Sequence, residues 1–542
     1  MEKTTRRQFL ASSAVLMGAA MVGMTACAPS QQRDGENTDL SGTGEVAWDE
    51  EFDVIVVGGG LAGTATAVTV ATEGSGATCL LLEKGENEHG GGNSQFSAGM
   101  ISATNDYENA LAYFKALRGE NTTVSDAVCE AHVTALAEHV DWLRNLGAGD
   151  DLVVSWETDD NDGYVPEYPE LCPTEYFGRL RFSGEGVGGW KHVQSFMVDK
   201  VKANSDLITH LTQARALRLV QDPTSREITG VVYDHKGKQI TARAKLGVVM
   251  CCGGYENNPE MLQNYQKAYG VHPCAGLSNE GDGVTMCAQV GAHMWHFGGI
   301  AGFNNNFASL DGQTFASNDG GATIVHDKGI IVGTNGRRYY MEVGGYGNKN
   351  LENDDLRIHV GHRHGDQQFG GSWMHQQLPP VSWYIFDQAS MSDGAADKLQ
   401  MDDPVAEGWG FKADSLEELE KLIETSTGEL KKTVDYWNTL CDIGEDMAFY
   451  RPASTLTKIT EPPFYAMKMV PNFLNTNGGA ERNENGEILD LEKEPIPHLY
   501  GAGEFGSVWS DMYNGGGNLT ECLGWGRIAA RSALKNKTND VQ

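Results

Sequence analysis

The sequence predicts an α/β fold with a parallel sheet, and three observations lead to that prediction. The apolar residues 54–57 are typical of a short buried strand, and a helix-like run over residues 61–72 follows directly after three glycines. A second apolar run at residues 79–82 completes a strand–helix–strand unit. A third buried strand, residues 246–252, is again followed by glycines and by a helix-starting Asn-Pro pair.

The glycines of the first unit have the spacing Gly-x-Gly-x-x-Gly, which favours a dinucleotide site. Gly58 permits the sharp turn out of the strand, Gly60 lets a pyrophosphate approach the backbone, and Gly63 lets the helix lie close to the sheet. The N–H groups at the start of the helix suit a diphosphate. Glu83, at the end of the second strand, is placed to bind an adenosine ribose, and its charge disfavours a 2′-phosphate.

A glycine-rich turn in an ordinary strand–helix–strand unit is the alternative explanation of the spacing. The complete order of strand, glycines, helix, second strand and terminal acid favours nucleotide binding over that alternative. The pattern by itself does not separate NAD from FAD.

Length and charge set the broad class of the protein. A chain of 542 residues is long enough for two or more domains and a large core. Its formal net charge of −33 argues against nucleic acid or an anionic lipid surface as a partner, and a solvated acidic surface is the expected reading.

The first residues are expected to target the protein rather than to fold with it. Residues 4–10, which include Arg6 and Arg7, resemble a twin-arginine signal, and the apolar stretch over residues 9–24 is too short for a convincing membrane span. Residues 24–27 resemble a lipoprotein cleavage box with Cys27 as the lipidated residue. The sequence therefore predicts export by the twin-arginine route, to the periplasm or to the outer face of the cytoplasmic membrane. Cys27 is the expected position of a lipid anchor.

Further elements follow from the periodicity of apolar residues. Strands are expected over residues 208–220, 227–234, 240–245 and 498–500. Helices are expected over residues 106–118, 124–146, 416–440 and 519–534, after residue 259, and from about residue 283 to 290.

The cysteine pattern shows no haem motif, and the histidine pattern favours a loop over a metal site. The chain carries no Cys-x-x-Cys or Cys-x-x-Cys-His, and buried free thiols are expected for most cysteines other than Cys27. A histidine cluster leaves metal binding and a surface or pocket-lining loop as alternatives, and the loop is favoured because ligand spacing on a known scaffold is lacking. Its members are His359, His362, His364 and His375.

Several motifs together resemble the flavoprotein of the fumarate reductase/succinate dehydrogenase superfamily, in its soluble single-chain branch. That branch also includes urocanate reductases and 3-ketosteroid dehydrogenases. The matching segments follow the family's order over about residues 52–535. They are the first glycine unit with Glu83, residues 91–99, 252–259, 279–283, 462–466, 476–479, 501–504, 516–518 and 526–529.

The resemblance implies FAD as cofactor and an α/β fold in which a Rossmann-like FAD-binding domain is interrupted by an α+β capping domain. The expected divisions are a signal at residues 1–27, a flexible linker at 28–50, FAD-binding parts at 51–301 and 476–536, and a capping domain at 302–475.

The resemblance also implies which residues contact the cofactor. Glu504 is expected to hold the ribityl chain, and Asn518 and Leu519 open the last helix, whose dipole stabilises negative charge on the flavin. The full expected set is Gly58, Gly60, Leu61, Ala62, Gly63, Glu83, Lys84, Gly92, Asn93, Ser94, Ala98, Gly99, Gly253, Gly254, Asp282, Glu504, Asn518 and Leu519.

The chain departs from the family where fumarate reductases place their charged catalytic groups. Tyr346 stands where the proton-donating arginine belongs, Asn475 replaces a histidine, and Asn514 replaces an arginine. In the carboxylate-binding region only Phe303 is found. Because each lost charge-assisted hydrogen bond is worth roughly 1.5–3 kcal/mol, fumarate is expected to be a poor substrate.

What replaces those charges is similar to the Tyr-x-Gly-x-Gly stretch of 3-ketosteroid dehydrogenases. The similarity implies that the Tyr513 hydroxyl and the Gly517 N–H polarise a substrate ketone, as an oxyanion hole does. Tyr346 would then transfer the proton at the α-carbon. For both tyrosines the alternative is packing with a hydrogen-bonded hydroxyl.

The sequence thus predicts an FAD-dependent oxidoreductase that reduces, or in reverse forms, an activated C=C bond in a small enone, acrylate or steroid-like molecule. A separate membrane or cytochrome donor would supply the electrons. The alternatives are a dicarboxylate reductase of the fumarate type, and a non-catalytic flavin- or metal-binding redox lipoprotein.

Overall fold

A computed structural model describes most of the chain beyond its first 45 residues. The chain divides into two units, Met1–Val46 and Ala47–Gln542, and every element named below belongs to the second. The predicted signal, Cys27 and most of the linker lie outside the described residues and stay predictions. The described residues are 46–87, 92–97, 99–119, 123–156, 171, 177–183, 190–191, 193–266, 271–273, 275–312, 328–339, 342, 379–399, 401–451, 453–509 and 513–539.

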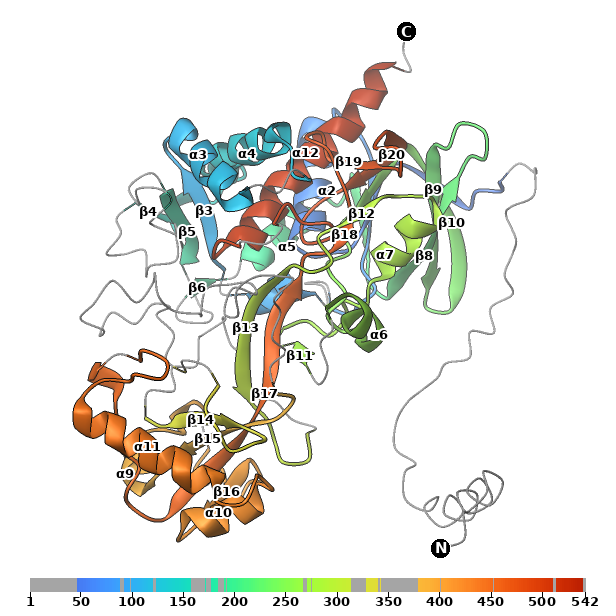
Figure 1. The fold of residues 1–542 in the computed structure, drawn as a ribbon. Helices are drawn as coiled ribbons and strands as arrows, with labels where there is room; N and C mark the ends of the chain where they lie inside the picture. The colour runs from blue at the N-terminus through green and yellow to red at the C-terminus, as the bar shows by residue number, and fades with distance from the viewer. Residues whose placement is uncertain are drawn as a thin grey trace, which may run out of the picture. The chain divides into compact units, whose positions relative to one another are not determined.

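The main sheet has eight strands, and its centre is parallel, as the sequence predicted (Figure 1). Parallel pairing joins β1 to β10 and to β2, β10 to β20, and β2 to β7. The path across the sheet is β19 (Glu487–Leu489), β20 (Pro495–Gly501), β10 (Lys238–Met250), β1 (Glu50–Val57), β2 (Cys79–Leu82) and β7 (Ile208–Leu211). An antiparallel pair, β8 (Ala214–Gln221) and β9 (Ile228–His235), extends from β10.

Both faces of this sheet are covered, which explains why its central strands are apolar throughout. Val54 and Val56 face one hydrophobic cluster, and Ile55 and Val57 face another, because successive side chains of a strand alternate. The first face is covered by α2 (Leu61–Glu73), α5 (Val193–Ala203) and α12 (Gly517–Asn539), with α2 packed against α12. The second face is covered by β8, β9 and α7 (Asp282–Gln289).

A six-stranded sheet is built around the long strand β17 (Phe464–Thr476). Its other members are β11 (His272–Pro273), β13 (Ile300–Phe307), β14 (Ile330–Gly333), β15 (Ser382–Phe386) and β16 (Gly410–Ala413). The helices α9 (Gln388–Ser392), α10 (Leu416–Leu422) and α11 (Glu429–Ile443) accompany it (Figure 1).

The antiparallel partners β13 and β17 lie side by side, and in their register Ala301 pairs with Asn475. These two residues are the predicted boundaries of the capping domain. Two hydrophobic clusters draw all their buried members from Phe307 to Met469, between those boundaries. The division into domains itself stays a prediction.

Two short strands, β12 (Met294–Trp295) and β18 (Gly479–Ala480), pair with each other. A further sheet has four antiparallel strands and lies beside two helices. Its strands are β3 (Ile101–Thr104), β4 (Leu152–Ser155), β5 (Phe177–Ser183) and β6 (Trp190–Lys191). The helices are α3 (Tyr107–Arg118), which begins after the capping side chain of Asp106, and α4 (Asp126–Asn145), which begins after that of Ser125. Helix α6 (Pro259–Met261) is capped by Asn258 and continues into a π-helical turn, Leu262–Gln266.

Four predicted elements differ from the structure. The strands expected over 240–245 and 246–252 are one strand, β10, because no turn residue separates them. The strand expected over 208–220 is divided into β7 and β8 by Gln213, which has a φ of +53°. The helix expected over 416–440 is two helices, because Gly428 adopts a φ of +77° before α11.

Among the described residues, no helix combines the length and apolar character needed to cross a bilayer. The seven described cysteines are not disulfide-bonded, in agreement with the expected free thiols.

Candidate active site

A cavity of about 1420 Å³ opens at the carboxyl ends of the central parallel strands. The residues just beyond β1, β2, β10 and β20 all line it, namely Gly58, Glu83, Cys251 and Ala502. This edge is where open α/β sheets bind their ligands, because the loops that leave the strands diverge there. The sheet topology therefore places the cavity.

The first glycine turn forms one wall of the cavity and tolerates no side chain at two positions. Gly58 has a φ of +109°, and a Cβ on it would lie 2.1 Å from the carbonyl oxygen of Cys251. A Cβ on Gly63 would lie 1.8 Å from the carbonyl oxygen of Gly58. The helix begins at Leu61 without a side-chain cap, and the Leu61 N–H donates to Ser94 Oγ (3.1 Å). The start of α2 thus faces the cavity.

Glu83 is fixed on the wall by two backbone groups. Its Oε2 accepts from the Gly59 N–H at 2.9 Å, and its Oε1 accepts from the Gly85 N–H at 2.6 Å. These bonds hold a carboxylate at the end of β2, where the sequence predicted a ribose contact.

Two cations and two acids pair beside Glu83. Lys84 Nζ lies 3.0 Å from Glu280 and 2.9 Å from Asp282, and Arg215 lies 3.1 and 2.6 Å from the same two carboxylates. Burial by itself raises the pKa of Asp282, but Lys84 and Arg215 outweigh that effect and lower it. The cations on this part of the wall are therefore neutralised by their neighbours.

Two buried carboxylates, Glu256 and Glu504, share their hydrogen-bond donors. The Asn93 amide donates to Glu256 (2.8 Å) and to Glu504 (3.1 Å), and the Asn279 amide donates to Glu256 (2.6 Å) and Glu504 (3.4 Å). Thr476 Oγ1 donates to the second oxygen of Glu256 at 3.1 Å. Five motifs that lie far apart in the sequence meet in this cluster.

The cluster carries no cation of its own. Burial raises the pKa of Glu256. Burial also raises the pKa of Glu504 well above its usual value, and the neighbouring charges of Glu256 and Glu521 raise it further. Arg482, the cation packed beside α12 at this point, is ion-paired with Glu521 instead. The two carboxyls therefore retain a proton more readily than exposed acids do.

Replacing Glu256 by Gln is expected to reduce the fall in stability with rising pH. An acid whose pKa is raised on folding stabilises the protein below its unfolded pKa, near 4.5, and that stabilisation is lost as the pH rises through the folded pKa. The free energy of unfolding of the wild type should therefore fall relative to Glu256→Gln as the pH rises above about 4.5, by up to about 1.4 kcal/mol per pH unit, the slope for one proton. Urea titrations at several pH values measure this difference.

Glu260→Gln is the matched control, because that carboxyl is exposed on α6. Parallel pH profiles for the wild type and Glu256→Gln would contradict the raised pKa of Glu256.

A second group of polar residues surrounds Tyr513, on a turn before α12. The Asn518 N–H donates to the Tyr513 hydroxyl at 3.0 Å, which strengthens that hydroxyl as a donor. The Asn518 side-chain amide donates to Asn475 (2.5 Å), whose own amide donates to Asn477 (3.1 Å). Asn475, Tyr513 and Asn518 line the cavity, and all three are uncharged.

One predicted contact at this turn differs from the structure. The Gly517 N–H donates to the carbonyl oxygen of Asn514 at 2.8 Å, so it closes the turn and is not directed at a substrate oxygen. Asn514 is buried, and its side chain accepts a hydrogen bond from the Tyr113 hydroxyl at 2.6 Å. The expected oxyanion contact from Gly517 is therefore corrected, because the helix start uses that donor itself.

A family model described as an FAD binding domain matches residues 53–519. The chain belongs to this family. Digoxin reductase of Eggerthella lenta is 25% identical over 97% of this chain and 96% of its own length. Vinyl phenol reductase of Lactiplantibacillus plantarum is 25% identical over 89% of this chain and 96% of its own.

Solved structures support the same family. A flavocytochrome c3 fumarate reductase in its open conformation matches with a TM-score of 0.64 and 25% identity, over 90% of this chain and 79% of that one. A 3-ketosteroid Δ4-(5α)-dehydrogenase from Rhodococcus jostii matches with a TM-score of 0.61 and 23% identity, and the match covers 90% of this chain and 98% of that one. These matches confirm the predicted superfamily and the fold class.

The family's cofactor fits the described cavity. The glycine turn, the uncapped start of α2 and the fixed Glu83 carboxylate suit the pyrophosphate and ribose of FAD. The side-chain oxygen of Asn518 is buried and has no partner among the described residues, which leaves an acceptor on the wall near Tyr513. The protein is an FAD-dependent oxidoreductase, as the sequence predicted.

The structure brings most of the predicted cofactor residues onto one wall. Those that line the cavity are Gly58, Gly60, Leu61, Ala62, Glu83, Lys84, Gly92, Asn93, Ser94, Gly253, Asp282, Glu504, Asn518 and Leu519. Gly63, Gly99 and Gly254 lie off the wall, and a Cβ on Gly254 would meet Thr476 Oγ1 at 2.2 Å. Ala98, Tyr346, the side chain of Phe303 and the four clustered histidines lie outside the described residues.

Sequence reasoning missed several lining residues. Asn279 belongs to a motif that was recognised, but only Asp282 of that motif was assigned a contact. Arg215 lies on β8, and no local signal in the sequence marks it as a lining residue, although in the structure it pairs with Asp282 at the cavity. The buried residues Cys251 and Cys522 and the partly buried Cys252 also line the cavity.

Proposed function

We propose that this oxidoreductase reduces a C=C bond conjugated to a neutral or singly charged carbonyl group. The observation that carries the proposal is the uncharged wall around Tyr513. Among the described residues, the polar side chains on this part of the wall are Asn475, Tyr513 and Asn518. The lining cations Lys84 and Arg215 lie elsewhere on the wall, where they are paired with acids. Such a wall offers a carbonyl hydrogen bonds but gives a dicarboxylate no ion pair.

In this proposal the chain polarises the substrate and the cofactor reduces it. FAD, when bound and reduced, supplies the hydride. Tyr513 donates its hydroxyl hydrogen bond to the substrate carbonyl oxygen, and the Asn518 N–H behind it supports the charge that develops there. Tyr346 is the proposed proton donor to the α-carbon, as the sequence predicted.

Two relatives support a substrate other than a dicarboxylate. Digoxin reductase and vinyl phenol reductase are named for such compounds, and each matches this chain over nearly its whole length. Other relatives are named as fumarate, urocanate and acrylate reductases, so reduction of C=C bonds is common to the group. We further propose a separate electron donor, because the sequence carries no Cys-x-x-Cys-His haem motif.

Single-turnover kinetics test the proposal. The dithionite-reduced protein is mixed with a panel of α,β-unsaturated ketones, lactones and monocarboxylates, and with fumarate, and the return of flavin absorbance is followed. At least one neutral or singly charged compound is expected to reoxidise the flavin ten times or more faster than fumarate does, because fumarate finds no ion pair near Tyr513. Rapid reoxidation by fumarate alone would contradict the proposal, and no reaction with any compound would favour a non-catalytic flavoprotein.

A further inference from the structure

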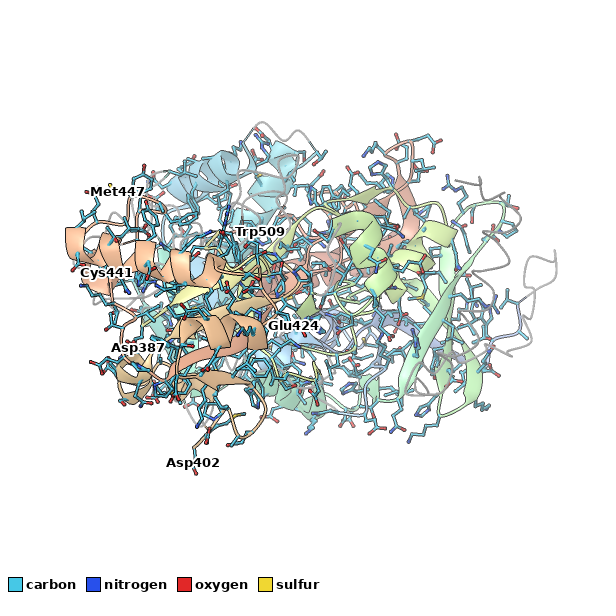
Figure 2. The ribbon with its side chains drawn as sticks, turned by 60° about the horizontal axis from the view of Figure 1, so that its bottom comes forward. Asp387, Asp402, Glu424, Cys441, Met447 and Trp509 are labelled. Carbon is cyan, nitrogen blue, oxygen red and sulfur yellow. The ribbon has the colours of Figure 1, made fainter. Side chains whose placement is uncertain are left out.

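A second, much smaller cavity lies between α3, α4 and the segment at residues 508–509, and shares no lining residue with the first. Its wall consists of phenylalanine, leucine and valine side chains together with four polar residues. The polar residues are Arg118, Cys129, His132 and Trp509. Trp509 is labelled in Figure 2.

The protonation state of His132 follows from its burial and from its hydrogen bond with Trp525 on α12. The Trp525 indole N–H donates to His132 Nδ1 at 3.3 Å, and an indole nitrogen only donates, so Nδ1 is the acceptor. Burial lowers the pKa of His132 to about 3, so the imidazole is neutral at physiological pH. The single proton of the ring is therefore on Nε2, which makes Nε2 a donor.

Three buried donors on this wall have no acceptor among the described residues: His132 Nε2, Trp509 Nε1 and Arg118 Nε. His132 and Trp509 are only 2% and 4% exposed, so solvent does not satisfy them. The Arg118 guanidinium uses another nitrogen for the Val124 carbonyl (3.1 Å) and for Asp126 (2.5 Å). Buried donors without partners are rare in proteins, and three on one small wall point to a ligand.

The chemistry of the wall selects an acceptor. None of the described residues on it carries a side-chain oxygen, and the Cys129 thiol is only a weak acceptor. A water molecule would need acceptors for its own two hydrogens, whereas an anion needs none. The Arg118 guanidinium is paired with Asp126, so Arg118 contributes the Nε donor to this wall and not an unpaired charge.

We propose that this cavity binds a small monovalent anion, either an inorganic anion such as chloride or the carboxylate end of a small acid. The ligand accepts hydrogen bonds from His132, Trp509 and Arg118. The site is distinct from the flavin cavity but lies next to the Tyr513 turn. The rings of Trp509 and Tyr513 are 5.4 Å apart, and a Cβ on Gly517 would lie 2.6 Å from the indole. An anion held by Trp509 Nε1 therefore fixes the ring against which that turn is packed.

Thermal unfolding of the holoprotein under controlled anion composition tests the site. Chloride, bromide, nitrate and formate are each titrated at constant ionic strength, balanced with the larger methanesulfonate anion. A saturable rise in the unfolding midpoint is expected for at least one of the four anions, because a ligand that binds only the folded state stabilises it. Trp509→Phe, which removes the indole N–H together with the five-membered ring that carries it, should weaken the apparent affinity at least tenfold.

Trp295→Phe is the matched control, because its indole N–H is also buried without a partner but lies outside the cavity. It should keep the wild-type anion affinity. A response to the three inorganic anions without formate identifies an inorganic ligand, and a stronger response to formate identifies a carboxylate.

Crystals of the wild-type holoprotein soaked in bromide give a readout that needs no variant. An anomalous peak within hydrogen-bond distance of His132 Nε2 and Trp509 Nε1 is expected. The absence of a saturable effect with all four anions, or a cavity that holds only water in the bromide crystals, would overturn the proposal.

Discussion

Replacing Tyr513 by Phe is expected to slow oxidation of the reduced flavin by substrate by about 100-fold or more, the usual effect of removing one oxyanion-hole donor. The hydroxyl lies on the cavity wall, where the Asn518 N–H supports it at 3.0 Å. The variant keeps the aromatic ring and its contact with Trp509, so the loss should appear in the chemical step and not in folding. Stopped-flow single turnovers with the best enone of the panel measure the rate.

Two comparisons separate this effect from damage to the cofactor site. Tyr500→Phe removes another buried hydroxyl, which accepts from Asn536 at 3.0 Å and does not line the cavity, and it should leave the rate unchanged. The flavin content and the rate of reduction by dithionite should be the same in both variants and the wild type. A Tyr513→Phe rate within twofold of wild type would remove the proposed role of the hydroxyl.

The parts of the site that local chemistry determines could be predicted from the sequence. The turn at Gly58, the close approach at Gly63 and the acid at the end of β2 each depend on a few consecutive residues. A parallel sheet then places the ends of β1, β2, β10 and β20 at one edge, whatever the intervening segments do. The position of the nucleotide-binding turn therefore followed from short patterns, whereas the strand order is known only from the structure.

Contacts between distant segments were beyond such reasoning. Asn93, Glu256, Asn279, Thr476 and Glu504 each belong to a recognised motif, but that two carboxylates share the amides of two asparagines is visible only after folding. The Gly517 N–H was expected to bind substrate because a motif was similar, whereas its bond to the Asn514 carbonyl depends on how tightly the turn closes. Motif similarity carries residue types and not the direction of each donor.

Replacing Glu342 by Gln is expected to cost about 3–5 kcal/mol of stability, because it leaves buried charge without its partner. Glu342 is fully buried and binds Arg338 through both oxygens, at 2.5 and 2.7 Å. Arg338 also binds Asp446 at 2.9 Å, and the guanidinium of Arg451 lies 3.6 Å from Glu342. Both guanidinium groups lie over the Trp437 ring, 4.7 and 4.8 Å from its centroid. In the variant Arg338 would keep only Asp446 as an ionic partner, and the Arg451 guanidinium would lose its ion pair with Glu342.

The same substitution also tests the proposed proton donor, because Glu342 precedes Tyr346 by only four residues. Glu342 Oε1 accepts a hydrogen bond from the Ile331 N–H of β14 at 3.3 Å, which connects Glu342 to that strand. Urea unfolding measures the stability loss, and single turnovers on the folded variant measure whether the proton donor is misplaced as well. Glu429→Gln is the control, since its exposed pairs with Arg337 and Lys432 contribute little in water, and its unfolding midpoint should barely move. Equal midpoints for the Glu342 and Glu429 variants would show that the buried network is not what holds the segment in place.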